Sequence, residues 1–305
     1  MSLNGVLNFY KPPGMTSAQA VAFVKRLTGE KTGHAGTLDP EAAGVLPLLL
    51  GKATRVCDEL MGRPKQYLAE VAFGSATDTQ DAQGKVLERC ELHPGLEQVR
   101  QAAAQFVGRG IQVPPQYSAL KVAGKTAYQL AREGKAARLS PRPVDFYEID
   151  IIRLTARNGA LLRVRCGKGA YIRTLCHDLG HALGGCAHMR FLLREECGGL
   201  SLRSSATPED LLDWRRTGFK TGQRWFAGLA SILDNYKRMS VLPEYRHLAV
   251  NGASLSRHMV QVGETVHEGA RVCLFAGKDL LGIYQIEGSM FRLITMLYVP
   301  SAPFD

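Results

Sequence analysis

The sequence predicts an α+β protein that ends in a small all-β domain. Segments with a strand pattern are interspersed with amphipathic helical segments over the first two thirds of the chain. From about Val241 the pattern changes to short β runs separated by turns, which is typical of a small barrel or sandwich. At 305 residues the chain is long enough for two domains.

The first helix is expected to begin after Thr16. The Thr16 side chain can cap the helix, and Gln19 stands three residues on, as in a capping box. The residues that share one helical face follow: Val21, Val24, Leu27 and Thr28. Residues 33–40 are rich in Gly and are expected to form a loop, whereas the apolar residues 45–50 are expected to be buried.

A strand is expected over residues 66–73, because every second side chain falls on one face: Tyr67, Ala69, Val71 and Phe73. Residues 74–84 are typical of a turn. Asn158-Gly159 stands between two strand patterns and is the best hairpin signal in the chain. The other elements are expected at 93–107 (helix), 147–154 and 160–166 (hairpin strands), 170–183 and 208–214 (helices), and 271–276, 280–286 and 290–299 (strands).

The charge balance favours a polyanionic partner. The chain has 38 Lys and Arg against 28 Asp and Glu, a net charge of +10, and nucleic acid is the usual partner of such a protein. No run of about 18 apolar residues and no signal-peptide pattern is present, so we expect a cytoplasmic protein without a membrane partner. The seven cysteines include no CxxC, so we expect reduced thiols.

Three side chains are candidates for chemistry. Asp39 stands before Pro40 on the Gly-rich loop, where a carboxylate can act as nucleophile or base, or only form a turn. Arg173 falls in the first turn of an expected helix, where the helix dipole disfavours a cation. It therefore has an anionic partner, such as Asp39 or a phosphate, or is a solvated surface residue. Tyr67 can stack on a base or pack in the core.

Two further clusters carry less weight. Residues 113–142 form a basic segment that could follow a phosphate backbone, although such a run is more often a solvated face. Its charges are Lys121, Lys125, Arg132, Lys135, Arg138 and Arg142, against the single acid Glu133. Zinc ligand types occur at Cys176, His177, His181, Cys186 and His188, but without the CxxC pair of a typical zinc site, so we expect no metal.

A series of ordered sequence blocks resembles the bacterial tRNA pseudouridine-55 synthase family (TruB). The blocks are KPPGMTS (11–17), GHAGTLDPEAAGVLP (33–47), KQY (65–67), TDTQDAQG (77–84), VPPQYSALKVAGKTAYQLAREG (113–134), KGAYIRTL (168–175) and DLGHALGGCAH (178–188). They cover most of residues 5–200. One block would be weak evidence, but this many in this order is specific.

The resemblance implies a pseudouridine synthase fold, with a mixed, largely antiparallel central sheet flanked by helices. The catalytic domain would cover residues 1–235, with an RNA-binding insertion at about 113–142, and a PUA-like RNA-binding domain would cover residues 241–305. The uridine at position 55 in the T loop of tRNA would be flipped out and isomerised. No cofactor or metal is implied. We expect the T stem-loop of tRNA as partner, no guide RNA, and a monomer.

The resemblance also implies a role for each matching residue. Asp39 would be the catalytic aspartate, which either attacks C1′ of the ribose or removes a proton from C2′. Arg173 would pair with Asp39, and Tyr67 would stack on the flipped base and help to remove the C5 proton. The substrate-binding residues would be His34, which fills the gap left in the loop, Tyr171 and Leu192, which line the uracil pocket, and Lys11, which supports the loop that bears Asp39.

Three alternative functions remain open from the sequence. A guide-RNA-dependent synthase of the dyskerin type would be longer, with basic tails and a fuller PUA domain. An RNA-binding protein or tRNA-folding chaperone would account for the basic charge, but not for Asp39, Tyr67 and Arg173 in their matching blocks. A glycosidase that releases uracil would need a second carboxylate to place a water molecule.

Overall fold

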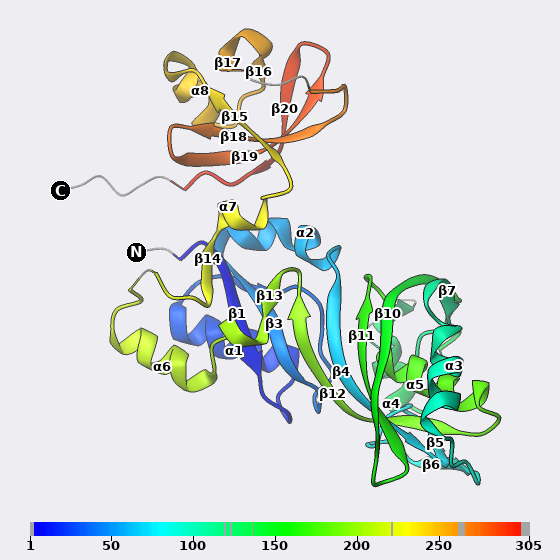
Figure 1. Ribbon diagram of the computed structural model, residues 1–305. Coiled ribbons are helices and arrows are strands. Elements are labelled where there is room, and N and C mark those ends of the chain that lie inside the picture. The colour runs from blue at the N-terminus through cyan, green and yellow to red at the C-terminus, as the bar shows by residue number, and fades with distance from the viewer. Residues whose placement is uncertain are drawn as a thin grey trace.

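The computed structural model describes residues 3–118, 120–122, 124–135, 137–220, 222–261 and 266–299. Figure 1 shows a large lower part, in which helices flank a mixed sheet, and a smaller upper part made mostly of strands. The α+β class and the C-terminal all-β domain that the sequence predicts are confirmed.

The large sheet is mixed but mainly antiparallel. Its order is β14 (Phe226–Gly228), β1 (Gly5–Lys11), β3 (Ala43–Leu50), β12 (Ala187–Cys197), β4 (Lys65–Phe73), β11 (Gly159–Cys166), β10 (Arg142–Thr155) and β7 (Gly108–Gln112). Two short strands extend it: β2 (Thr32–His34) pairs with β3, and β13 (Leu200–Ser201) pairs with β12. The pairing of β3 with β12 is parallel, and it brings two segments about 150 residues apart in sequence side by side.

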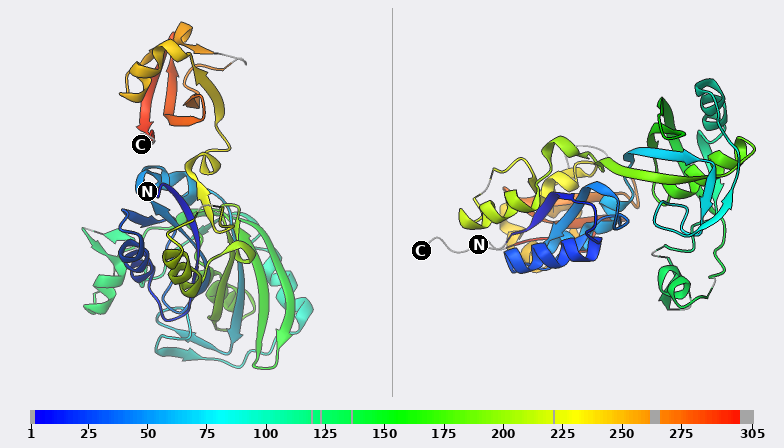
Figure 2. Two further views of the ribbon diagram at one scale, coloured as in Figure 1. Left: turned by 90° about the vertical axis from the view of Figure 1, so that its left-hand side faces the viewer. Right: turned by 90° about the horizontal axis from the view of Figure 1, so that it is seen from below.

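Helices pack at both ends of this sheet, as the three ribbon views show (Figures 1 and 2). The helices are α1 (Ser17–Thr28), the 3-10 turn η1 (Gly51–Val56), α2 (Cys57–Met61), α3 (Leu96–Ala104), α4 (Ala127–Arg132), α5 (Ile172–Ala182), the 3-10 turn η2 (Leu202–Ser204) and α6 (Pro208–Arg216). Two hairpins stand outside the sheet: β5 (Ser75–Thr77) with β6 (Val86–Arg89), and β8 (Lys121–Val122) with β9 (Lys125–Thr126). Among the described helices, none is long and apolar enough to cross a membrane.

The local signals in the sequence correctly predict several elements. The Thr16 hydroxyl accepts a hydrogen bond from the Gln19 amide (3.1 Å), and the Gln19 side chain accepts one from the Thr16 amide (2.7 Å), which completes the capping box. Asn158 adopts φ 51° in the turn between β10 and β11. Buried and half-buried side chains alternate along the first half of β4, as expected.

The structure departs from the prediction in three places. Residues 74–84 do not form only a turn, because β5 lies within them and pairs with β6. The helix expected over 93–107 is shorter, since Gly95 is its N-cap and it ends at Ala104. β10 begins at Arg142, before the expected start at Tyr147, because it pairs with β7 as well as with β11.

Two cysteines form a disulfide, Cys90 with Cys186. The expectation of reduced thiols throughout is therefore wrong for this pair, and five other cysteines are free. The partners are 96 residues apart, so no local pattern reveals them. They meet because the backbone of each is hydrogen-bonded to Gly74. The Cys90 amide donates to the Gly74 carbonyl (3.1 Å), and the Gly74 amide donates to the Cys186 carbonyl (2.9 Å).

The C-terminal part is a curled sheet of short strands. Its order is β16 (Leu255–Ser256), β20 (Met290–Met296), β19 (Asp279–Glu287), β18 (Arg271–Ala276), β15 (Lys237–Val241) and β17 (Val260–Gln261). The turns η3 (Pro243–Tyr245) and η4 (Arg257–Met259) and the helix α8 (Arg246–Val250) join these strands, and α7 (Leu229–Ile232) leads in from the large sheet. The strands predicted near 271, 280 and 290 are confirmed.

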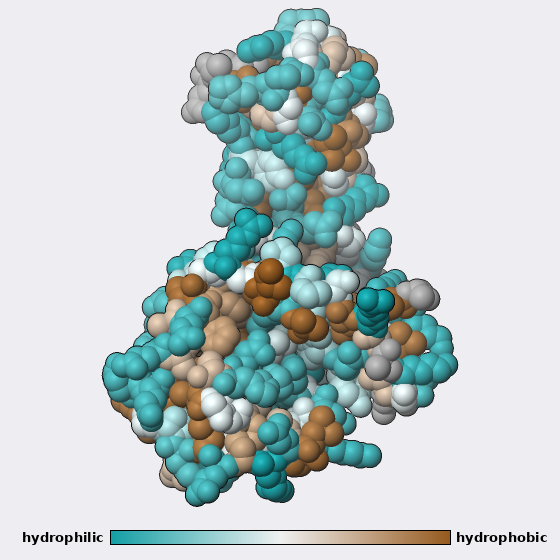
Figure 3. Space-filling view, turned by 90° about the vertical axis from the view of Figure 1, so that its right-hand side faces the viewer, coloured by the Kyte–Doolittle hydropathy of each residue, from teal (hydrophilic) through white to brown (hydrophobic). Residues whose placement is uncertain are grey.

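The two parts meet at a shared apolar cluster. Figure 3 shows that the surface of the molecule narrows between the two parts. The buried members of the cluster come from both parts and from the connection: Val6, Ala35, Leu49, Ala53, Val56, Leu60, Leu229, Ile232, Leu233, Cys273, Ile283 and Leu297. Polar contacts flank the cluster, since Arg63 pairs with Asp234 (2.6 Å) and the Tyr236 hydroxyl donates to Glu59 (2.6 Å). The C-terminal part thus packs on η1 and α2, directly before β4.

Candidate active site

A pocket of about 260 Å³ opens where the loop after β2 meets β4, β12 and the start of α5. Five residues that the sequence singles out line it together: Asp39, Tyr67, Tyr171, Arg173 and Leu192. They come from four separate stretches of the chain, so only the packing of the sheet against α5 brings them together. His34 and Lys11 are not among the lining residues.

Asp39 and Arg173 form a two-pronged ion pair at this pocket. Arg173 Nε lies 2.9 Å from Oδ2 of Asp39, and Nη2 donates to Oδ1 at 3.0 Å. Arg173 also donates to the carbonyls of Thr79 (3.1 Å) and Tyr117 (2.8 Å). The Arg173 side chain is 5% exposed and that of Asp39 is 34% exposed. The acid is thus held from behind while part of it faces the pocket.

The start of α5 fixes the position of Arg173. Tyr171 is the N-cap residue, and the buried Gln112 side chain accepts from the Tyr171 amide (3.0 Å) and donates to its carbonyl (3.2 Å). Arg173 therefore stands in the first helical turn, as the sequence predicts. Its partner is Asp39, so the alternative of a solvated surface arginine is excluded.

The groups around Asp39 shift the pKa of its carboxyl group in opposite directions. Burial raises the pKa of its carboxyl group, because the charged form loses water, and the nearby Asp81 carboxylate also raises it. The Arg173 guanidinium opposes both effects through its charge and its hydrogen bonds. The ionised form of Asp39 thus depends on Arg173.

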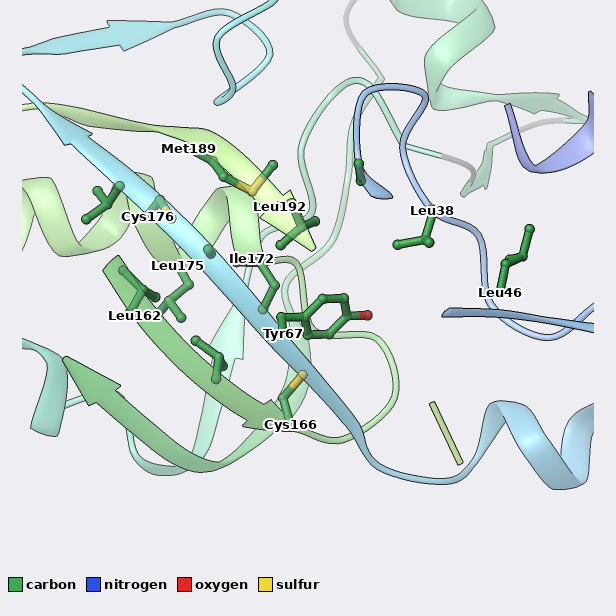
Figure 4. Packing of buried hydrophobic residues seen from close by; sticks show 14 of the residues in the cluster. Leu38, Leu46, Tyr67, Leu162, Cys166, Ile172, Leu175, Cys176, Met189 and Leu192 are labelled. Carbon is green, nitrogen blue, oxygen red and sulfur yellow. The ribbon is translucent and has the colours of Figure 1, made fainter. Parts of the chain in front are cut away.

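Tyr67 forms part of the floor of the pocket with Leu192 and Ile172. Figure 4 shows Ile172 and Leu192 on one side of its ring and Cys166 on the other, with the hydroxyl directed toward the side where Leu38 lies. Burial raises the pKa of Tyr67 to about 12, although the charge of Arg194 opposes the shift. The phenol therefore stays protonated near neutral pH, which suits stacking and hydrogen bonding better than service as a base.

Lys11 and His34 lie outside the pocket lining. Lys11 is fully buried, and its ammonium group donates to the carbonyls of Pro12, Met15 and Pro40 (2.7–2.9 Å). Burial lowers its pKa to about 8. His34 is half-buried in β2, and its Nδ1 atom has no hydrogen-bond partner among the described residues. Burial lowers the pKa of His34, so its ring is neutral at pH 7.

Three charged residues of this site carry little signal in the sequence. Arg194 and Lys65 line the pocket, and both are buried. Asp81 approaches Arg173 from the side opposite Asp39, at 3.8 Å. The signal that could find them is weak: Asp81 and Lys65 stand in family-like blocks, whereas Arg194 reads as one charge in the polar sequence Arg194-Glu195-Glu196.

The basic segment lies across the pocket from β4. Ser118 lines the pocket and the carbonyl of Tyr117 holds Arg173, so this segment closes one wall. The Arg132 side chain lies outside the described residues. Lys125 and Lys135 both pair with Glu133, which neutralises part of the expected charge run.

The residues weighed as zinc ligands are engaged elsewhere. Cys186 forms the disulfide, and Cys176 is buried in the core, where the low polarity raises its pKa. The rings of His177 and His181 meet edge to face, with their centres 4.4 Å apart. Within the described ranges, no group of three or more His, Cys, Asp or Glu side chains is placed to hold a metal ion.

The arrangement suits an attack on, or a proton transfer from, a sugar beside an apolar base pocket. Asp39 supplies an ionised oxygen, Arg173 orients it, and Tyr67 offers a flat surface for a base. Asp39 is the one carboxylate among the described lining residues. A glycosidase would need a second carboxylate facing the substrate, and Asp81 lies behind Arg173 instead.

Comparison with known families gives consistent matches. The model of the N-terminal domain of the TruB family of pseudouridylate synthases matches residues 25–172. The model of the C-terminal domain of tRNA pseudouridylate synthase B matches residues 173–233. Together these matches span the large sheet from the end of α1 to α7.

Several relatives match over two thirds or more of their length. The tRNA pseudouridine synthase B of Alkaliphilus oremlandii is 37% identical over 284 residues, which cover 92% of each chain. That of Clostridium acetobutylicum is 36% identical over 97% of this chain and 100% of its own. That of Symbiobacterium thermophilum is 46% identical over 68% of this chain and 71% of its own.

Solved structures with a similar fold belong to larger assemblies. One is an H/ACA RNP bound to a substrate RNA containing 2′-deoxyuridine, with a TM-score of 0.73 and 26% identity over 97% of this chain and 85% of that chain. Another is a Cbf5-Nop10-Gar1 complex, with a TM-score of 0.70 and 27% identity over 96% and 84%.

Proposed function

The chain belongs to the TruB family of pseudouridylate synthases, and from that premise we propose which of its residues isomerise uridine 55 of tRNA. It is an enzyme that converts uridine in tRNA to pseudouridine. One observation carries the assignment of residues: the Asp39 carboxylate is held by two nitrogens of Arg173 at a pocket that Tyr67 and Leu192 line.

Asp39 acts on the ribose of the target nucleotide. The uridine leaves the T loop and enters the pocket, because the reacting atoms are inaccessible in the folded loop. Asp39 then attacks C1′ or removes the C2′ proton, and the N1–C1′ bond breaks. The uracil turns and C5 bonds to C1′; in the first route the Asp39 oxygen leaves C1′ as this bond forms, and in the second route Asp39 returns the proton to C2′. The proton lost from C5 is balanced by the proton gained at N1.

The other pocket residues bind and orient. Arg173 keeps Asp39 ionised and oriented toward the ribose. It does so with two parallel hydrogen bonds, which a lysine could not make. Tyr67 stacks on the uracil as a protonated phenol, and Tyr171 and Leu192 enclose the base. Lys11 supports the loop from below, and His34 occupies the space vacated by the flipped nucleotide.

The RNA partner is the T stem-loop of tRNA. The catalytic domain over residues 1–235, with its insertion at about 113–142, holds the loop, and the domain over 241–305 contacts RNA further away. We place the enzyme in the cytoplasm, where its substrate is found, and expect a monomer that needs no guide RNA. The excess of 38 basic over 28 acidic residues supports an RNA partner.

Tritium release tests the assignment. The substrate is an unmodified tRNA transcript that carries tritium at C5 of uridine, and no other RNA is present. Wild type should release tritium, whereas Asp39→Asn should bind the transcript and release none. Asp213→Asn, which alters an exposed ion pair with Arg216, is the matched control and should react as wild type does.

Four outcomes would contradict the proposal. Release by Asp39→Asn at the wild-type rate would remove Asp39 from the chemistry. Release from a transcript that lacks the T-loop uridine would exclude position 55 as the target. Free uracil among the products would indicate a glycosidase, and activity only after addition of cellular RNA would indicate a guide-dependent enzyme.

A further inference from the structure

The loop that carries Asp39 is held by three buried side chains. Each belongs to a different element, and each donates a hydrogen bond to one carbonyl of the loop. The three carbonyls belong to alternate residues: Arg194 donates to Gly36 (2.9 Å), Ser17 to Leu38 (3.0 Å) and Lys11 to Pro40 (2.9 Å). The backbone is thus fixed at alternate residues of the stretch 36–40, and residues 36–39 line the pocket.

Arg194 is the least expected of these three groups. It is 1% exposed and is the largest fully buried side chain among the described residues. Its guanidinium donates from Nη2 to Gly36 and from Nε to the Val45 carbonyl (2.7 Å), so it bridges the loop to β3. These carbonyls, and the Tyr67 side chain with which Arg194 also shares a hydrogen bond, are neutral groups, and a buried cation in such a setting is costly for folding.

The backbone of Arg194 is fixed as tightly as its side chain. β12 pairs in parallel with β3 at this point, with Arg194 opposite Gly44. A Cβ atom at Gly44 would lie 2.3 Å from the Arg194 carbonyl oxygen, so the two strands touch without room for a side chain. The guanidinium is therefore carried on a rigid strand, which suits a residue that sets the position of a loop.

The same guanidinium influences several groups around the pocket. Its charge and a side-chain hydrogen bond with Tyr67 lower the pKa of Tyr67 against the effect of burial, and its charge also lowers the pKa of Lys11 and His34. Asp39 is not among these groups, because its partners are Arg173, Asp81 and Lys11. Arg194 therefore affects Asp39 through the loop backbone rather than through direct charge.

We propose that Arg194 is a positioning residue for the isomerisation, acting through its hydrogen bond to the Gly36 carbonyl to hold Asp39 in reach of the ribose. The inference rests on the proposed function of Asp39. Without the guanidinium, the Gly36 carbonyl loses its hydrogen-bond donor, and the loop backbone that carries Asp39 can shift. A misplacement of about 1 Å in a reacting group can cost on the order of 100-fold in rate.

Single-turnover tritium release separates positioning from folding. Arg194→Met keeps the bulk of the side chain and removes the donors, and Arg194→Lys keeps a donor that can reach one of the two carbonyls. Arg190→Met is the matched control: it lies on the same strand, and its guanidinium pairs with Glu70 (2.8 Å) away from the loop. Each variant is mixed in excess with labelled tRNA, and rate constant, amplitude and tRNA affinity are measured.

We expect Arg194→Met to lower the rate constant about 100-fold at full amplitude, with unchanged tRNA affinity. Arg194→Lys should recover part of this loss, and Arg190→Met should match wild type. The acid limb of the pH–rate profile should not move in either Arg194 variant, because Arg194 does not pair with Asp39.

A rate constant for Arg194→Met within about threefold of wild type would overturn the inference. So would a lower amplitude with an unchanged rate constant, since that result means fewer folded molecules rather than a misplaced acid. Should the Met variant fail to fold, a wild-type rate constant in Arg194→Lys would overturn it equally. An inactive wild-type chain would instead refute the proposed function itself, so the two failures are distinguishable.

Discussion

Replacing Arg173 by methionine would leave the Asp39 carboxylate without the cation that holds it. The change removes both contacts to Asp39 (2.9 and 3.0 Å) and the contact to Asp81 (3.8 Å). It also removes the donors to the carbonyls of Thr79 and Tyr117. Two carboxylates would then face each other across the space that the guanidinium occupies.

The structure gives the size of the effect. Removing one partner of a buried ion pair typically costs about 3–5 kcal/mol. The Arg173 side chain is 5% exposed, but that of Asp39 is 34% exposed, so water screens part of the remaining charge. We therefore expect Arg173→Met to lower the free energy of unfolding by about 2–3 kcal/mol at pH 8.

The loss should depend on pH, with a defined sign. Burial already raises the pKa of Asp39, and Arg173 opposes that shift, so removing Arg173 raises the pKa further. An acid with a raised pKa in the folded state binds its proton more tightly there than in the unfolded chain. The protonation of Asp39 therefore stabilises the folded state fully below the unfolded pKa of about 3.9. This stabilisation is lost as the pH rises through the pKa of Asp39 in the folded state.

Urea unfolding of both proteins at a series of pH values from 5 to 8 checks this reasoning. The difference between wild type and Arg173→Met should widen as the pH rises. In tritium release, whatever activity remains should show an acid limb displaced to higher pH, because Asp39 must be ionised. Equal destabilisation at every pH, together with an acid limb at the wild-type position, would refute the view that Arg173 stabilises the charge of Asp39.

Two further predictions concern the scaffold. Gly44→Ala should cost about 3 kcal/mol or more, because φ is 112° and a Cβ would meet the Arg194 carbonyl, whereas Gly14→Ala, with a positive φ in open space, should cost about 1 kcal/mol. Thermal unfolding measures both, and similar melting temperatures for the two variants would contradict the close approach. Reducing the bond between Cys90 and Cys186 should lower the free energy of unfolding by about 2–4 kcal/mol. Urea midpoints that do not change with reductant would contradict the crosslink.

Local chemistry in the sequence determined much of the secondary structure. Thr16 and Gln19 define a helix start through hydrogen bonds that span three residues, and Asn158-Gly159 defines a hairpin through one left-handed turn. Alternation along β4 likewise predicts its buried face, to which Tyr67 belongs. Such signals are readable because each depends on neighbours a few residues away.

Residue type and sequence block also indicated the candidate acid and its partner. Asp39 on a Gly-rich loop, and a cation in the first turn of a helix, are each unusual enough to be noticed alone. Their pairing could only be suggested, because the two residues lie 134 positions apart. The distance of 2.9 Å between Arg173 Nε and Asp39 Oδ2 depends on how β3, β12 and β4 align and on where α5 begins against them.

The tertiary structure alone decided the burial of Arg194, the place of Asp81 behind Arg173, and the bond between Cys90 and Cys186. In the sequence, Arg194 is followed by two glutamates and resembles an ordinary surface charge. The parallel pairing of β12 with β3 turns it inward instead. Burial is a property of the assembled sheet, because solvent is excluded by strands that are distant in the chain, and no short window of sequence contains them.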